Sequence, residues 1–255
     1  MTRKRLRILI PFVTLLVLFF GCQLVHEIPG LPRIISFVFP KPSLILKDLW
    51  QNWPWLLRHL KVTLFEALCG FGIAVILGVA LALSYLFVPT LERVIVPLAI
   101  AVRNVPFVAI APILFILLGY GPLPKIIIVM IVTFFPVMSN LSAGFSSVSL
   151  NLQERFYIYR ATRWQLFTKL QLPAAVPYFV TGLEIGISNI VIAAIVGELL
   201  GTKAGMGFVI LQTVSQYRIP LLMATVLVTT LASVAITTLS KWSTCLLFRR
   251  WLQQF

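Results

Sequence analysis

Charged residues are scarce in this chain. Of its 255 residues 11% are charged, only seven are Asp or Glu, and two are His. A soluble domain carries roughly a quarter charged residues, so the composition does not fit a soluble protein. Cysteine is also rare: Cys22, Cys69 and Cys245 have neither disulfide nor metal spacing. Because His26 and His59 lie far apart as well, we assign no metal site.

The motifs of common catalytic sites are missing. No lysine follows a glycine-rich loop as an ATP-binding P-loop requires, and there is no H-E-x-x-H zinc motif. Gly144-Phe145-Ser146 begins like a serine-hydrolase elbow, but Val148 stands where the second glycine would be. We therefore predict no catalytic residue and no cofactor in this chain.

Long hydrophobic runs are the dominant feature. Hydrophobic residues make up 60% of the chain, and the mean hydropathy is +1.01. With their flanks, most runs reach the roughly 20 residues that a helix needs to cross a bilayer. The sequence therefore predicts an all-α polytopic membrane protein with about six transmembrane helices, at residues 8–20, 67–88, 94–118, 126–138, 176–200 and 221–239.

The net charge of +14 would suit a nucleic-acid-binding protein. However, Lys and Arg cluster at the ends of the hydrophobic runs, where they would lie among lipid headgroups, and no basic stripe alternates with aromatic residues. We predict lipid contact and no nucleic-acid partner. Six spans place both termini on one side, and the basic ends, residues 3–7 and 249–250, predict that this side is the cytoplasm.

The first 60 residues are expected to form an uncleaved first span and an outer helix. Ser43 is predicted to cap this helix, which would lie in the outer membrane interface with Trp50, Trp53 and Trp55. Residues 61–255 would then form the core.

Small residues recur on two of the expected spans. Gly70, Ala74, Gly78 and Ala82 follow a spacing of four, and a second stripe contains Gly182, Gly186, Ala193 and Gly197. Small residues let helix backbones approach closely. Both stripes therefore predict tight packing in a compact multi-helix core.

Prolines and polar residues mark the candidate translocation path. Pro97, Pro106 and Pro112 lie in the third span, where each can kink the helix, so this span is expected to border a cavity or gate. Polar groups inside a bilayer are costly, which makes them candidates for function. The path or gate candidates are Arg103, Asn104, Pro106, Asn140, Glu184, Asn189 and Glu198.

Each of these polar residues also has a structural interpretation. Arg103 could instead snorkel to the inner headgroups, or pair with Glu184. Glu198 fits an outer gate or a helix cap better than a substrate ligand. Asn140 and Asn189 could simply form interhelical hydrogen bonds.

The loop between the fourth and fifth spans has helical chemistry and a basic, aromatic surface. Phe156, Arg160, Arg163 and Phe167 follow helical spacing. Such a helix is either an amphipathic anchor on the membrane surface or a docking element for a soluble partner. The residues alone leave both alternatives open.

The same loop resembles a known family signature. The signature of the family reads E-A-A, then three residues, G, nine residues and I-x-L-P. Glu154 fits its first position, position 160 is the glycine slot, and Leu170-Gln171-Leu172-Pro173 fits its end with unbroken spacing. Together with residues 197–201 and 205–207, this makes residues 60–246 similar to permeases of binding-protein-dependent ABC importers. The resemblance implies the type I importer permease fold and a bacterial inner-membrane location.

In that family the loop helix, here at about residues 150–168, couples the spans to the ATPase. The resemblance implies this role for Glu154, Arg155, Phe156, Tyr159, Arg160, Ala161 and Thr162. Three positions depart from the signature, because Arg155 and Phe156 replace the alanines and Arg160 replaces the glycine. Since small residues permit close approach, either the partner ATPase has a wider and more acidic groove, or this copy couples weakly beside another permease. We expect the wider and more acidic groove.

The resemblance also implies the partners. These are a cytoplasmic ABC ATPase dimer that binds ATP and Mg, a second permease copy forming a homodimer, and an extracytoplasmic solute-binding protein. Residues 105–112 and 134–136 look most like the nitrate, sulfonate, taurine and bicarbonate branch, which includes pyrimidine-precursor and riboflavin carriers.

The alternative function is a secondary carrier, which would need inverted repeats that are not visible in this sequence. An intramembrane enzyme or scaffold is disfavoured by the missing catalytic groups.

Overall fold

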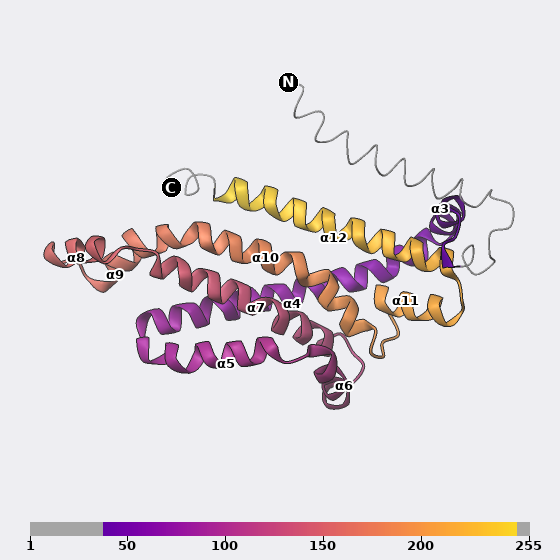
Figure 1. The fold of residues 1–255 in the computed structure, drawn as a ribbon, viewed down its shortest axis with the longest axis horizontal. Helices are drawn as coiled ribbons and strands as arrows, with labels where there is room; N and C mark the ends of the chain where they lie inside the picture. The colour runs from indigo at the N-terminus through magenta and orange to yellow at the C-terminus, as the bar shows by residue number, and fades with distance from the viewer. Residues whose placement is uncertain (1–37, 249–255) are drawn as a thin grey trace, which may run out of the picture.

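The computed structural model describes residues 38–248, and every regular element within that range is helical. The first expected span, Cys22, His26 and the basic ends of the chain lie outside the described residues. The elements, shown in Figure 1, are α3 (Pro42–Gln51), α4 (Trp53–Phe87), the 3₁₀ turn η1 (Pro89–Leu91), α5 (Glu92–Asn104), α6 (Phe107–Leu118), α7 (Leu123–Ser146), α8 (Leu150–Ile158), α9 (Arg163–Leu166), the π-helical turn η2 (Phe167–Gln171), α10 (Leu172–Glu198), α11 (Met206–Ser215) and α12 (Ile219–Leu247).

The expected all-α membrane fold is confirmed. Within residues 38–248, four helices are long and apolar enough to cross a bilayer, at Trp53–Ser84, Leu123–Ser146, Arg163–Glu198 and Ile219–Thr244. The segments Pro89–Asn104 and Phe107–Leu118 meet at an angle of 93° and raise the count to five if they form one span. The third span, expected over residues 94–118, is therefore broken at a right-angled corner, which is sharper than the kinks expected at its prolines.

This corner is made by Pro106. The Asn104 side chain donates to the Ile100 carbonyl oxygen at 2.9 Å, at the last residue of α5, and the chain at Val105 and Pro106 is extended. A proline disfavours the helical conformation at the residue before it, and Val105 is extended where α5 ends. Pro97 and Pro112, in contrast, lie within α5 and α6.

The core of the molecule is α7 packed against α4 on one side and α10 on the other. Side chains at the contact are small, as the two stripes predicted. A Cβ added to Gly70 would lie 2.6 Å from Val129 Cβ, and one added to Gly182 would lie 2.9 Å from the Pro136 carbonyl oxygen. Because no side chain fits there, the three backbones approach closely.

The outer helix is shorter than expected. α3 begins after Lys41, and Ser43 lies inside it rather than capping it. Trp53 and Trp55 belong to α4, which runs continuously through the expected division after residue 60. Asn52 separates the two helices, so the predicted helix carrying all three tryptophans was wrong.

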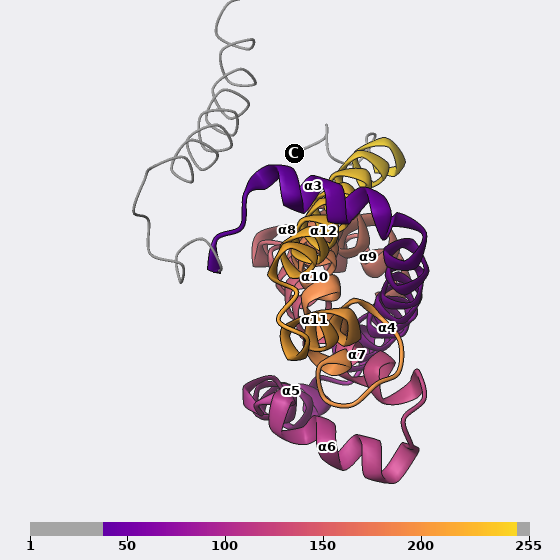
Figure 2. The same ribbon diagram turned by 90° about the vertical axis from the view of Figure 1, so that its right-hand side faces the viewer.

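The two ends of the molecule differ in what they contain. At one end α3, the start of α4, α11 and the start of α12 gather, while α8 and α9 lie at the opposite end (Figure 1). Viewed from the α3 end, α5 and α6 lie to one side of the other helices, and α3 lies on the other side (Figure 2). The candidate coupling residues therefore lie at the end of the bundle, and the broken helix lies along its side.

Candidate functional site

The candidate coupling residues form an exposed projection at one end of the molecule. α8 has no buried residue, and its apolar side chains Leu150, Tyr157 and Ile158 are exposed. Figure 1 shows α8 at the extreme end of the long axis, beyond the ends of α4 and α5. Glu154 and Arg155 are exposed as well, so this short helix leaves most of its surface uncovered by the described part of the chain.

The helix expected over this whole loop is instead two helices. α8 ends at Ile158, and the Arg160 and Ala161 N–H groups donate to the Tyr157 and Phe156 carbonyl oxygens, each at 2.9 Å. This pair of bonds is the Schellman motif, in which the residue after the cap adopts a left-handed conformation. Arg160 has a φ of 53°, so the glycine of the family signature falls on a position that favours glycine for backbone reasons.

α9 begins with a complete capping box. The Thr162 hydroxyl accepts from the Gln165 N–H at 3.2 Å, and the Thr162 N–H donates to the Gln165 side chain at 2.8 Å. This arrangement fixes the residue at which α9 begins, after the turn that follows α8. Thr162 therefore has a local structural role, which sequence reasoning did not assign to it.

An aromatic cluster joins this projection to the bundle. The buried Phe167, in the π-helical turn, packs its ring 5.3 Å from Phe87 of α4 and 6.0 Å from Phe145 of α7. Its third neighbour is Trp164 of α9, at 5.5 Å between ring centroids. Phe167 therefore connects α9 by packing contacts to both neighbouring spans.

A second site is a cavity of about 400 Å³ beside the α5–α6 corner. Three of the polar path candidates line it: Arg103 from α5, Asn140 from α7 and Asn189 from α10. Their neighbours come from the middle of α7 and α10, since the lining includes Phe135 and Ile185. The third span does border a cavity, although the role of its residues in transport remains a prediction.

The other path candidates do not line this cavity. Asn104 and Pro106 are next to it in sequence but do not line it. The predicted pair of Arg103 with Glu184 is wrong: the Arg103 guanidinium lies over the Phe135 ring, 4.8 Å from its centroid, and makes no salt bridge to Glu184. Such a cation–π contact stabilises the cation without a carboxylate.

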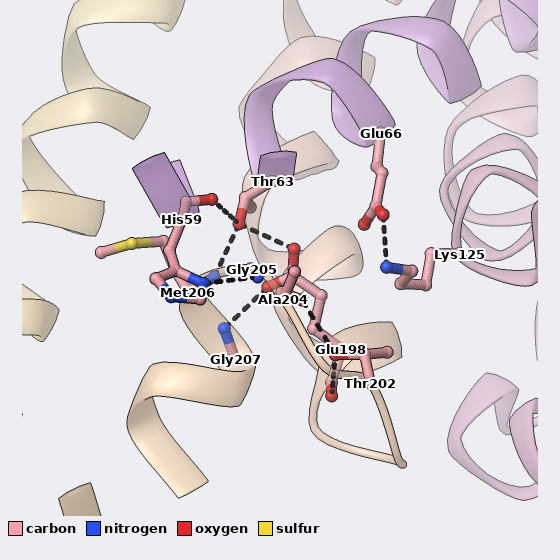
Figure 3. Close-up of polar contacts among 10 residues, drawn as sticks. All are labelled: His59, Thr63, Glu66, Lys125, Glu198, Thr202, Ala204, Gly205, Met206 and Gly207. Atoms are coloured by element: carbon pink, nitrogen blue, oxygen red, sulfur yellow. Dashed lines mark hydrogen bonds and ion pairs between the residues drawn. The ribbon is translucent and has the colours of Figure 1, made fainter. Parts of the chain in front are cut away.

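Glu198 belongs to a third site, at the α3 end. Its carboxylate accepts from the Thr63 hydroxyl and from the Gly207 N–H, each at 2.7 Å (Figure 3). The two preceding N–H groups of this helix start, those of Gly205 and Met206, donate to His59 Nδ1 at 3.0 Å and to Thr63 Oγ1 at 2.8 Å. Glu198 therefore acts as a helix cap, one of the two roles expected for it, and it is fully buried.

Beside this cap lies a buried ion pair that sequence reasoning missed. Lys125 of α7 contacts Glu66 of α4, with both side chains almost fully buried (Figure 3). The spacing of His59, Thr63 and Glu66 would place them on one helix face, which is the signal that could have revealed the cluster. Lys125 gives no such signal, because it stands alone before a hydrophobic run.

Comparison with known proteins identifies the family. Residues 74–253 match the family described as "Binding-protein-dependent transport system inner membrane component". The chain belongs to this family. It is thus an inner-membrane, multi-pass permease subunit of an ABC importer, and the permease itself is non-catalytic. A secondary carrier is not favoured.

Individual relatives agree with this assignment. The formylaminopyrimidine transport permease protein of Halalkalibacterium halodurans is 31% identical over 78% of this chain and 80% of its own. The riboflavin transport system permease protein of Chloroflexus aurantiacus is 30% identical, over 78% and 74%. The permease of the MetNI methionine ABC transporter shares the fold, with a TM-score of 0.58, 18% identity, and coverage of 80% of this chain and 96% of that one.

Proposed function

We propose that this permease imports a small organic solute by coupling α8 to a cytoplasmic ABC ATPase dimer. Two copies of the chain would form the translocation path, with an extracytoplasmic binding protein delivering the solute and both termini in the cytoplasm. The ATPase would bind ATP and Mg. The observation that carries this proposal is the exposed α8 projection, which holds the residues that match the family's coupling signature.

The position of α8 favours a protein partner over a membrane anchor. An anchoring helix lies in the plane of the headgroups with one apolar face buried. α8 instead projects along the long axis, beyond the ends of the neighbouring helices (Figure 1), and its apolar side chains are exposed. Tyr157, Ile158 and Tyr159 are available to fill a groove on a soluble protein.

The contacts behind α8 support a coupling role. Trp164, Phe87 and Phe145 all pack against Phe167, so the chain that follows α8 contacts two spans at once. A groove that moved on ATP binding would displace α9 and these rings together. Since packed interiors transmit displacement rather than absorb it, the spans would move too.

The substrate class follows from the relatives as a proposal. Formylaminopyrimidine and riboflavin appear in the names of two relatives that align with most of this chain. Aliphatic sulfonates and taurine appear in the names of two others. A small organic molecule of one of these kinds is the proposed cargo.

The test is affinity purification of the tagged chain in mild detergent, with mass spectrometry of the proteins that accompany it. We expect a stoichiometric P-loop ATPase, which is lost in Arg160→Glu and in Ile158→Glu. Arg160→Glu keeps a non-glycine residue at the left-handed position, so it changes the charge while leaving the backbone cost similar. It tests whether the groove is acidic.

The matched control is Lys47→Glu, the same kind of charge reversal at an exposed residue of α3 at the other end of the molecule. It should keep the ATPase. If both α8 variants retained the ATPase at wild-type stoichiometry, α8 would not be the docking element. If no ATPase accompanied the folded wild-type chain, the coupling proposal itself would fail.

A further inference from the structure

A polar cavity lies at the α3 end of the molecule and shares no residue with the cap around Glu198. It measures about 300 Å³. Its lining includes Asn52, Gln212, Gln216 and Arg218, with Trp55 and Leu221 beside them. These residues come from the α3–α4 junction, the end of α11 and the start of α12, which gather at this end (Figure 1). The cavity is therefore a product of the fold, formed where three separate parts of the chain meet.

A tight turn after α11 holds Arg218 at this cavity. The Arg218 N–H donates to the Thr213 carbonyl oxygen at 2.9 Å. The Tyr217 N–H donates to the Val214 carbonyl oxygen at 3.0 Å. These two bonds form a Schellman motif, in which Tyr217 takes the left-handed position with a φ of 55°. The motif fixes the backbone of Arg218 beside the last turn of α11, so its guanidinium extends from a defined place.

Hydrogen-bond donors predominate in the cavity. Arg218 carries five N–H donors and a positive charge, and no carboxylate among the described residues forms an ion pair with it. The Gln212 Oε1 is enclosed without a partner, which leaves the amide nitrogen as the group that can meet a ligand. Asn52 Nδ2 donates one N–H to the Asp48 carbonyl oxygen at 2.8 Å and keeps its second. No acidic side chain in the described part of the chain lines the cavity, so the cavity favours an anion.

The start of α12 adds to the same positive potential. α12 runs over Ile219–Leu247, and Arg218 directly precedes its first residue. The first N–H groups of a helix have no partner within it, and the helix dipole places partial positive charge there. The cavity reaches this first turn, since Leu221 lines it. An anion in the cavity would therefore meet a guanidinium and a helix N-terminus together, which is a common way for proteins to bind phosphate.

The cavity lies at the depth of the lipid headgroups. Candidate spans begin at Trp53 and at Ile219. The lining residues Asn52 and Arg218 stand immediately before these two starts. Trp50 and Trp53, before and after Asn52, are both exposed, and tryptophan favours the boundary between membrane and water. The phosphates that a membrane itself holds at this depth are those of its lipids, so a phospholipid is the source that fits the site.

We propose that this cavity binds the headgroup of an anionic phospholipid such as phosphatidylglycerol. The phosphate would accept hydrogen bonds from Arg218, from the Gln212 amide and from the first turn of α12. The glycerol hydroxyls would bond to Asn52 and Gln216. One bound lipid would then join the α3–α4 junction to the turn between α11 and α12. Binding at this site is independent of ATPase docking and of the orientation of the chain in the membrane.

The test is native mass spectrometry of the full chain released from nanodiscs that contain phosphatidylglycerol and phosphatidylcholine in equal amounts. We expect phosphatidylglycerol to be retained in preference. Arg218→Gln should lower this preference about fivefold, because one basic side chain near a membrane surface contributes on that scale. Arg218→Lys keeps the charge and should keep most of the preference. The matched control is Lys203→Gln, because Lys203 lies between α10 and α11, is exposed like Arg218, and does not line the cavity.

Equal retention of the two lipids by the wild-type chain would overturn the proposal, and so would the same loss of preference in Lys203→Gln and Arg218→Gln. Glycerol phosphate separates the two possible sources of the phosphate group. We expect this soluble ester not to compete, since it lacks the acyl chains that hold a headgroup at the membrane surface. If it displaced phosphatidylglycerol at an equal concentration, the site would recognise a soluble phosphate and the assignment to a lipid would be wrong.

Discussion

Glu198 shows how much one buried carboxylate can organise. It accepts from Thr63 and from Gly207, and its side chain is fully enclosed. The geometry leaves no room beside it, since a Cβ added to Gly205 would lie 2.1 Å from its Oε1. Gly205 also has a φ of 108°, which disfavours any other residue. A larger residue at position 205 would therefore displace the Glu198 carboxylate from its present place.

Glu198→Ala should lower the free energy of unfolding by at least about 2 kcal/mol, because a buried hydroxyl and a buried N–H would lose their acceptor. Glu198→Gln keeps one acceptor oxygen and should cost about half as much. The measurement is thermal unfolding of the purified chain in detergent. Glu184→Ala is the control, because Glu184 is only half-buried on the same helix. Equal midpoints for Glu198→Ala and Glu184→Ala would contradict the capping role.

The sequence allowed Glu198 to be singled out, because a glutamate in a hydrophobic run is conspicuous. The sequence did not reveal that His59 and Lys125 lie near Glu198. Both stand beside hydrophobic runs, where a basic residue is ordinarily explained by contact with lipid headgroups. Arg160 departs from the family signature at a position with a φ of 53°, so the backbone conformation gives a reason for the glycine that sequence reasoning missed. The expected close approach to the ATPase stays a prediction.

At the scale of helices, the close contact between α4 and α7 depends on which face of α4 carries a glycine. Gly70 faces α7, where a Cβ would lie 2.7 Å from the Ile126 carbonyl oxygen. Gly72, two residues further on, has nothing within 4 Å of the same added atom. The two glycines share a helix and differ only in the face they occupy, which makes them a matched pair.

Gly70→Ala should destabilise the chain by about 1–3 kcal/mol, because α4 and α7 would have to separate to accept the methyl group. Gly72→Ala should be neutral or stabilising by up to about 1 kcal/mol, since alanine favours the helix. The measurement is the thermal unfolding midpoint of both variants in one detergent. A similar loss in both would show that α7 does not contact α4 as described.

The broken helix marks the limit of pattern reasoning at this scale. Three prolines predicted kinks, but Pro97 and Pro112 stay within helices and only Pro106 stands at the corner. What differs is the backbone, which is extended at Val105 and Pro106 but helical at Pro97 and Pro112. A sequence cannot show which proline coincides with such a terminus, because the 93° bend also depends on α7 packing against both halves.

For the molecule as a whole, the proposed orientation places α3 outside and α8 inside. Replacing Cys22, Cys69 and Cys245 with serine provides a background for single cysteines at Trp50 and Tyr159. These two side chains are equally exposed, at 84% each, and lie at opposite ends of the molecule. Exposure therefore cannot account for a difference in labelling.

In right-side-out membrane vesicles, a membrane-impermeant maleimide should label Trp50→Cys at once and Tyr159→Cys only after the vesicles are opened. The physical basis is the excess of Lys and Arg expected on the cytoplasmic side. The measurement is the labelled fraction on a gel before and after permeabilisation. The reverse pattern would invert the whole topology and place α8 out of reach of a cytoplasmic ATPase.

The cap on α11 has a consequence for biosynthesis. Glu66 can pair with Lys125 once α7 has been synthesised, but His59 and Thr63 bond to Gly205 and Met206, which follow them by 146 and 143 residues. Until then their polar groups stand in the membrane without their final partners. A chain that stops short of residue 205 would therefore leave the His59 Nδ1 and the Thr63 hydroxyl without these two donors, as polar groups within a hydrophobic helix.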